Sequence, residues 1–259
     1  MTCTVVVERT GHLAQVILNR PEVLNAIDNT LAEELRAACQ ALADDGGVWA
    51  VILRGAGDRA FCAGADLKAR AGFTPELWAA QRDLFRHMFS QVRCVPQPVI
   101  AAVHGFALGG GTELAMLSDF VIASDDAVFG LTEVGLGIIP GGGGTQNLAR
   151  VIGRNRAKEL IFSARRFGAR EALELGLVNH VVPRAELLPR ASAIAEAIMQ
   201  NSPFAVRQAK WAIDRGADLP FEDGLECEHE AYMRAIASED RREGTAAFNE
   251  KRRPRFIGC

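Results

Sequence analysis

Two glutamates stand among glycine and aliphatic residues in the middle of the chain. Glu113 lies in GGGTELAML, and Glu133 follows in FGLTEVGLGIIPGGGG. A carboxyl group in apolar surroundings loses hydration, which raises its pKa unless a partner compensates. A raised pKa prepares a carboxyl group for acid/base chemistry. The residues alone also allow a plainer interpretation, in which Glu113 is an acid in the first turn of a helix and Glu133 is a surface residue.

Two turns of small residues could supply backbone donors to the same site. Ala63, Gly64 and Ala65 follow a predicted strand, and the run 108–111 leads into the predicted helix that carries Glu113. Backbone without large side chains can approach a ligand closely, and amides at a helix N-terminus are aided by the helix dipole. Two such turns could aim two amide hydrogens at one oxygen, as an oxyanion hole requires. Spacing alone is equally compatible with ordinary tight turns.

Hydrophobic patterning predicts the elements that would position these turns. We expect two strands in TVVVERTGHLAQVILNR around a Thr-Gly turn, and buried strands in WAVILRG and PVIAAVHG. DFVIAS and AVFGL are predicted to be paired strands. Helices are expected over LAEELRAACQALADD behind an Asn/Thr cap, over TPELWAAQRDLFRHMFSQV, and from GGGTELAML and GGTQNLARVIG. From about Ala157 onward almost only helices are predicted, which indicates a mixed α/β fold with a helical C-terminal region.

Composition narrows the classes of function. The chain has 259 residues, 49% of them hydrophobic, and a formal net charge of −3, so nothing resembles the basic surface of a nucleic-acid-binding protein. The six cysteines are scattered, which favours reduced thiols over a disulfide framework. HEAYM begins like the zinc motif HExxH but ends in Met233, so no metal is predicted. No stretch suggests a signal peptide or a membrane span, and we expect a cytoplasmic protein.

Three motifs together resemble those of the enoyl-CoA hydratase (crotonase) family. They are FCAGADLKA, GFALGGGTELAMLSDF and FGLTEVGLGIIPGGGGTQ, in that family's order and spacing, with further similarity in AKELIFSAR, EALELGLVNHVVP and FNEKRRP. The resemblance implies an α/β fold, the ClpP/crotonase spiral of ββα units. It also implies a core over residues 1–200 with an acyl-CoA site, and a helical region over 201–259 for oligomerisation and for covering the site. A homotrimer or a dimer of trimers is expected.

The resemblance also implies roles for individual residues. The amides of Ala65 and Gly110 would hold the thioester oxygen, Glu113 would deprotonate a water molecule, and Glu133 would protonate the α-carbon. The amide of Gly141 would help to position that water. Other residues match positions that contact CoA: Ala63, Asp66 and Leu67 along the groove, and Phe248 and Lys251 from the neighbouring subunit. A solvated basic tail is an equal alternative for the cluster that contains Lys251. CoA would be part of the substrate, and no cofactor is expected.

The sequence predicts one reaction and leaves several alternative functions open. The predicted reaction is addition of water across the 2,3 double bond of an enoyl-CoA. GGGTELAM, IIPGGGGTQ and AKELIFSAR are most similar to methylglutaconyl-CoA hydratases, some of which bind AU-rich RNA. The matching helix LAEELRAACQALADD carries one Arg and four acids, so we predict no RNA binding. Hydration of methylglutaconyl-CoA, double-bond isomerisation and a non-catalytic acyl-CoA-binding protein are the alternatives, and the presence of both glutamates favours hydration over isomerisation.

Overall fold

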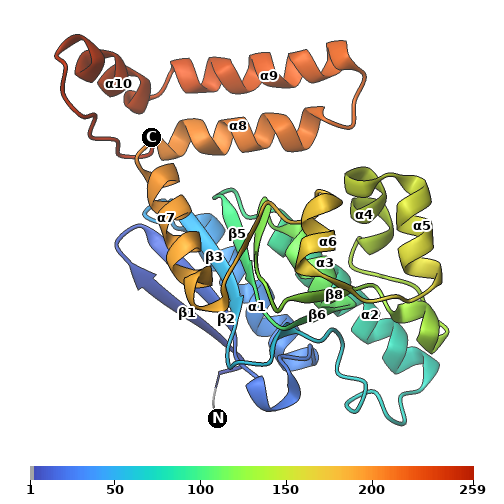
Figure 1. Cartoon of the computed structure of the whole chain (residues 1–259). Helices are drawn as coiled ribbons and strands as arrows, with labels where there is room; N and C mark the ends of the chain where they lie inside the picture. Colours follow the sequence, from blue (N-terminus) through green and yellow to red (C-terminus); the bar gives the residue numbers. More distant parts are fainter. Residues whose placement is uncertain (1–2) are drawn as a thin grey trace.

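The computed structural model describes residues 3–259 as an α/β core with a helical extension (Figure 1). A six-stranded sheet has the order β1-β2-β3-β5-β7-β10, and a four-stranded sheet has the order β4-β6-β8-β9. All pairs are parallel except β1 with β2 and β8 with β9. The strands are β1 (Val5–Thr10), β2 (Leu13–Leu18), β3 (Ala50–Gly55), β4 (Ala60–Cys62), β5 (Val99–Val103), β6 (Phe106–Leu108), β7 (Phe120–Ser124), β8 (Val128–Gly130), β9 (Phe167–Gly168) and β10 (His180–Val182).

Seven α-helices are interspersed with the strands in the core of the described chain, and three more form its C-terminal part. The core helices are α1 (Asn29–Asp44), α2 (Pro75–Arg93), α3 (Gly110–Leu117), α4 (Gly144–Ile152), α5 (Arg154–Phe162), α6 (Ala169–Glu174) and α7 (Leu187–Met199). Three short 3-10 helices are η1 (Pro21–Val23), η2 (Glu133–Leu136) and η3 (Arg184–Glu186). The last helices, α8 (Pro203–Gly216), α9 (Phe221–Ile236) and α10 (Glu239–Asn249), lie apart from the sheets (Figure 1). No helix within residues 3–259 is both long and apolar enough to cross a membrane.

The larger sheet is covered on both faces, which explains its nearly continuous apolar strands. One set of alternating residues, including Val51 and Leu53, packs with Leu31 and Leu35 of α1. The intervening residues, such as Ile52 and Ile100, pack against α7 through Leu187, Ala191 and Ala195. Both faces are therefore buried, and the sheet forms a rigid base for the loops at its edge.

Two of the sequence-based expectations about elements are wrong. β7 and β8, predicted to pair, lie in different sheets, because β7 already has β5 and β10 on its two edges. β8 pairs instead with β6 and β9. Helix α1 is capped by Asp28, whose Oδ1 accepts a hydrogen bond from the Leu31 amide at 2.8 Å, and the expected Asn29/Thr30 cap lies inside the helix.

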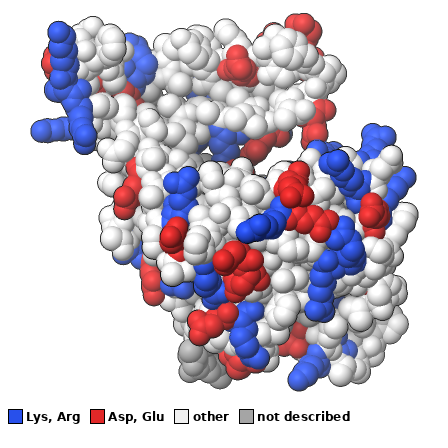
Figure 2. Space-filling view, in the orientation of Figure 1, with Lys and Arg blue, Asp and Glu red and all other residues white. Residues whose placement is uncertain are grey.

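The C-terminal helices form a long hairpin with little core of its own. Helices α8 and α9 contact each other along their length, and Gly216 and Gly224 let their backbones come close. In Figure 2 positive and negative side chains are interspersed over the core, whereas the visible surface of this hairpin is largely uncharged. The predicted division of the chain near residue 200 would fall between α7 and α8 and stays a prediction.

Candidate active site

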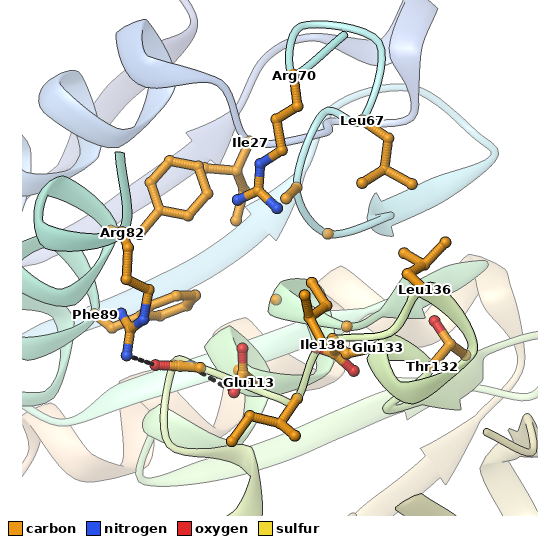
Figure 3. A pocket seen from close by; sticks show the side chains of 18 of the residues that line it. Ile27, Leu67, Arg70, Arg82, Phe89, Glu113, Thr132, Glu133, Leu136 and Ile138 are labelled. Atoms are coloured by element: carbon orange, nitrogen blue, oxygen red, sulfur yellow. Dashed lines mark hydrogen bonds between the residues drawn. The ribbon is translucent and has the colours of Figure 1, made fainter. Parts of the chain in front are cut away.

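A cavity of about 600 Å³ brings together the turns that the sequence singled out. Its lining includes Ala63, Gly64 and Ala65 from the loop after β4, Gly109 and Gly110 from the start of α3, and both glutamates (Figure 3). Apolar side chains make up much of the remaining wall, among them Ile27, Leu67, Trp78, Phe85, Phe89, Leu136, Ile138 and Ile139. An apolar cavity with a few convergent polar groups is the usual form of a small-molecule site.

Glu113 is held at the bottom of this cavity by the N-terminus of another helix. Its side chain is 2% exposed, and its Oε1 accepts hydrogen bonds from the amides of Gly142 at 2.6 Å and Gly144 at 2.8 Å. Gly144 is the first residue of α4, so the positive end of that helix faces the carboxylate. A Cβ atom on Gly144 would lie 2.9 Å from Glu113 Oε1, which explains why only glycine fits there.

Opposing effects act on the pKa of Glu113. Burial raises it above its ordinary value, while the amides of Gly144 and Gly142 and the charge of Arg82 act to lower it. The Nη2 of Arg82 also donates to the carbonyl oxygen of Gly141 at 2.6 Å, which fixes the glycine loop beside the carboxylate (Figure 3). The hydrogen bonds to Oε1 favour the ionised form of Glu113, and Oε2 accepts no hydrogen bond from any described residue.

Glu133 is in a different environment from Glu113. It begins η2, its Oε2 is buried, and no residue within the described chain donates a hydrogen bond to that oxygen. Burial and the nearby charge of Glu113 raise the pKa of Glu133 to about 7. Gly109 approaches it closely, since a Cβ there would lie 3.1 Å from Glu133 Oε1. The pair thus has one carboxyl whose ionised form is stabilised by two amide hydrogen bonds against the effect of burial, and one that is half protonated near neutral pH.

The amides of Ala65 and Gly110 are both free of protein acceptors. Neither donates a hydrogen bond within residues 3–259, and both residues line the cavity. The two loops are in contact, because a Cβ on Gly64 would lie 2.7 Å from the oxygen of Leu108 and 3.3 Å from the nitrogen of Gly110. Gly110 is the first residue of α3, where N–H groups have no partner inside the helix. Two free donors on touching loops are what an oxyanion site needs.

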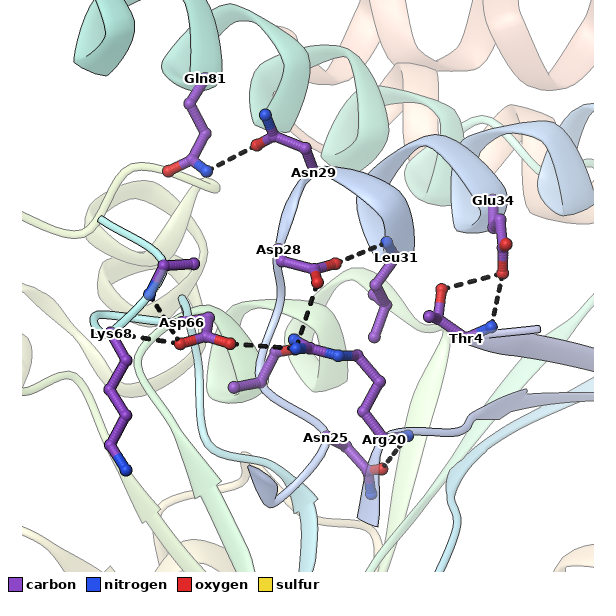
Figure 4. A network of polar contacts seen from close by, with 12 residues as sticks. Thr4, Arg20, Asn25, Asp28, Asn29, Leu31, Glu34, Asp66, Lys68 and Gln81 are labelled. Atoms are coloured by element: carbon purple, nitrogen blue, oxygen red, sulfur yellow. Dashed lines mark hydrogen bonds and ion pairs between the residues drawn. The ribbon is translucent and has the colours of Figure 1, made fainter. Parts of the chain in front are cut away.

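A half-buried polar network holds the loop that carries Ala65 (Figure 4). The Nη2 of Arg20 lies 3.1 Å from a carboxylate oxygen of Asp28 and 3.1 Å from one of Asp66. The Ile27 amide donates to Gly64, and the Asp66 amide donates to Ile27, so backbone bonds flank Ala65 on both sides. This network fixes where the Ala65 amide lies.

Three residues expected to contact CoA lie outside the lining of this cavity. The Asp66 carboxylate pairs with Arg20 and also accepts hydrogen bonds from the amides of Lys68 and Ala69, so the contact of Asp66 with CoA, which the resemblance implied, stays a prediction. Phe248 lies in the last turn of α10 and is 84% exposed, and Lys251 comes two residues after that helix ends; neither residue lines the chain's own cavity. Ala63, Leu67 and Gly141 do line the cavity.

Other residues of the site were not anticipated from the sequence. The amides that bind Glu113 belong to Gly142 and Gly144, and the glycine run before a predicted helix is the signal that could have pointed to them. Arg70 and Arg82 also line the cavity. The sequence did not indicate this, because an arginine on a loop or an amphipathic helix is ordinarily exposed to solvent. Within residues 3–259 no cluster of three His, Cys, Asp or Glu side chains is placed to hold a metal ion.

Comparison with known proteins identifies the family. The model of the enoyl-CoA hydratase/isomerase family matches residues 8–258. The chain belongs to this family. The protein YngF of Bacillus subtilis, named for the enoyl-CoA hydratase/isomerase family, is 47% identical over 96% of both chains. The short-chain-enoyl-CoA hydratase of Clostridium acetobutylicum is 43% identical over 96% of this chain and 95% of its own.

Solved structures place the fold in the same family. The crystal structure of an enoyl-CoA hydratase from Bacillus anthracis has a TM-score of 0.96 and 47% identity, and covers 99% of this chain and 100% of its own. The crotonase fold predicted from the motifs is therefore confirmed, with parallel ββα units and a helical C-terminal region. The names of these relatives support the family as a whole and do not single out its methylglutaconyl-CoA branch.

Proposed function

We propose that the protein is an enoyl-CoA hydratase, which adds water reversibly across the 2,3 double bond of an enoyl-CoA thioester to give a 3-hydroxyacyl-CoA. One observation carries the proposal. Two carboxyl groups in different environments line the same apolar cavity as two free backbone amides: Glu113 accepts two amide hydrogen bonds, and Oε2 of Glu133 accepts none within residues 3–259. This arrangement offers a base, an acid and an oxyanion site, which are the three groups that water addition to a conjugated thioester requires.

Each group has a defined part in the proposed reaction. The amides of Ala65 and Gly110 bind the thioester oxygen and draw electron density from the double bond. Ionised Glu113 removes a proton from a water molecule as its oxygen bonds to C3, and protonated Glu133 gives a proton to C2. The products are the 3-hydroxy thioester, protonated Glu113 and ionised Glu133, and proton exchange with water restores the pair. Loss of one amide donor is expected to slow the reaction by about 10²- to 10³-fold.

The amide of Gly141 was expected to position the attacking water, and we retain this as part of the proposal. Gly141 lines the cavity, and its carbonyl oxygen is fixed by Arg82. Water addition forms one C–O bond and one C–H bond with no net oxidation or reduction, and the carboxyls carry the protons, so the proposed route needs no metal or redox cofactor and CoA enters only as part of the substrate. Ala63 and Leu67, on the loop that carries the Ala65 amide, would contact the pantetheine arm.

We also propose a homotrimer or a dimer of trimers in the cytoplasm. The helical extension exposes large apolar side chains that a partner copy would cover: Ile213, Phe221, Tyr232, Met233 and Phe248. Because Phe248 and Lys251 lie away from their own cavity, they could contact CoA bound by a neighbouring copy, where Lys251 would suit a phosphate. A trimeric or hexameric mass in solution would support this assembly, and a monomer would refute it.

Isomerisation of the double bond is the second candidate reaction. Isomerisation needs a single acid/base residue. Glu113, which accepts hydrogen bonds from two amides, supplies a second one, and this favours hydration. The test is to incubate the protein with crotonyl-CoA, with a longer enoyl-CoA and with methylglutaconyl-CoA, and to identify the products by mass. A gain of one water supports hydration. A shifted double bond with unchanged mass supports isomerisation, and binding without reaction supports a non-catalytic acyl-CoA-binding protein.

A further inference from the structure

Arg70 places an unpaired positive charge on the wall of the apolar cavity. Its guanidinium points into the cavity from the wall opposite Glu113 and Glu133 (Figure 3). The Nε donates to Gln81 Oε1 at 2.6 Å, while Nη1 and Nη2 donate no hydrogen bond to any residue of the described chain. Burial lowers the pKa of Arg70 from its ordinary value, as expected for a cation that has lost part of its hydration.

The guanidinium of Arg70 is held in place rather than free to swing into solvent. It stacks on Trp78, with its central carbon 4.4 Å from the ring centroid, and lies 5.4 Å from that of Phe85. Gln81, which accepts its Nε–H, is 4% exposed and in turn donates to Asn29 at 2.6 Å (Figure 4). The aromatic rings and this chain of hydrogen bonds fix the orientation of the unused N–H groups.

The acids of the cavity do not neutralise Arg70. Within residues 3–259 it forms no ion pair, although two carboxyl groups line the same cavity. Glu113 is bound by two amides and lies near the charge of Arg82, and the pKa of Glu133 is raised to about 7. A hydrocarbon tail filling the cavity would displace water from the Arg70 N–H groups and give them no acceptor.

We infer that Arg70 binds a carboxylate at the far end of the acyl chain, so that the preferred substrates are enoyl-CoA thioesters with a terminal carboxylate. A planar guanidinium whose Nη1 and Nη2 are both unused matches a carboxylate in bidentate geometry along the edge between them. The inference rests on the proposed function for the reaction itself, but the binding preference can be measured without turnover. A charge-assisted bidentate contact corresponds to about 10- to 100-fold in affinity.

The test compares two saturated thioesters of matched shape, which cannot be hydrated. Glutaryl-CoA ends in a carboxylate, and 5-methylhexanoyl-CoA ends in an isopropyl group of the same outline. Binding of each is measured by calorimetry to the wild type, to Arg70→Met, and to Arg86→Met. Arg86 lies exposed on the same helix, α2, as Trp78 and Phe85 and controls for the loss of a positive charge near the site.

The wild type and Arg86→Met are expected to bind glutaryl-CoA at least about tenfold more tightly than 5-methylhexanoyl-CoA. Arg70→Met should lose this preference while its affinity for 5-methylhexanoyl-CoA is kept, which also shows that the cavity is intact. The inference is overturned by equal binding in the wild type, by a preference that survives in Arg70→Met, or by equal weakening of both thioesters, which would place Arg70 on the CoA moiety. A preference that depends on Arg70 in a protein that fails to hydrate any enoyl-CoA would contradict only the proposed reaction.

Discussion

Protonated Glu133 should set the alkaline limit of the reaction. Burial and the charge of Glu113 raise its pKa to about 7, and the proposed role requires the protonated form. About half of the free enzyme would then be competent at pH 7, about a tenth at pH 8 and about a hundredth at pH 9. We therefore expect kcat/KM for crotonyl-CoA to fall roughly tenfold per pH unit above pH 7. At acidic pH the rate should also fall as Glu113 becomes protonated, and its raised pKa moves this acidic limb to higher pH than for an ordinary glutamate.

The profile is measured as the initial loss of the enoyl-thioester absorbance between pH 5 and pH 9.5. Glu133→Gln keeps the shape of the side chain but cannot exchange a proton, so its residual rate should be low and should lack the alkaline limb. Glu33→Gln, on the exposed face of α1, is the matched control and should keep the wild-type profile. An alkaline limb retained in Glu133→Gln, or a rate independent of pH between 7 and 9, would refute this assignment.

Three other outcomes follow from the same contacts. Gly144→Ala should lower turnover at least tenfold by pushing on Glu113, whereas Gly168→Ala, where a Cβ meets nothing within 4 Å, should match the wild type in the same assay. The pKa of Glu133 is raised from 4.5 to about 7, so the folded wild type loses stability as pH rises and this side chain ionises. The melting temperature of Glu133→Gln should therefore rise relative to that of the wild type between pH 5 and 8. A difference that stays constant over this range would contradict the prediction. Arg20→Met should lower kcat by loosening the Ala65 loop with little change in KM, and an unchanged kcat would remove Arg20 from that role.

Local sequence patterns predicted the helices and strands that carry the site, whereas the pairing of strands distant in the sequence could not be predicted from them. The buried strands β3 and β5 are short continuous apolar runs, α2 begins at a Thr74 cap followed by Pro75, and α3 follows a glycine run, so their positions follow from the sequence. The short strands β4, β6 and β9 have two or three residues each, too few for any periodicity, and they pair only through the second sheet. The predicted pairing of β7 with β8 failed for the same reason, since only the whole sheet shows that β7 has no free edge.

Residues that lie within the three sequence motifs could be assigned to one cavity from the sequence. Glu113, Glu133, Ala65 and Gly110 all line one cavity, as their motifs indicated. The side chain of Asp66 could not be placed from its motif, because its partner Arg20 lies far away in the sequence and becomes a neighbour only in the fold.

Arg70 also escaped prediction. Its surroundings depend on how the first turns of α2 fold over the cavity, and no local pattern marks this. Specificity therefore depends on contacts that form only when the loop after β4 and helix α2 meet.

The central claim is that Glu113 and Glu133 together add water to an enoyl-CoA. Its most direct test is the reaction of crotonyl-CoA in ¹⁸O-labelled water, followed by the mass of the product formed by the wild type, Glu113→Gln and Glu133→Gln. We expect the wild type to form a 3-hydroxyacyl-CoA with one labelled oxygen, and each variant to form it at least about 100-fold more slowly while still binding the thioester. Tight binding without incorporation of label in the wild type, or undiminished incorporation in either variant, would contradict the claim.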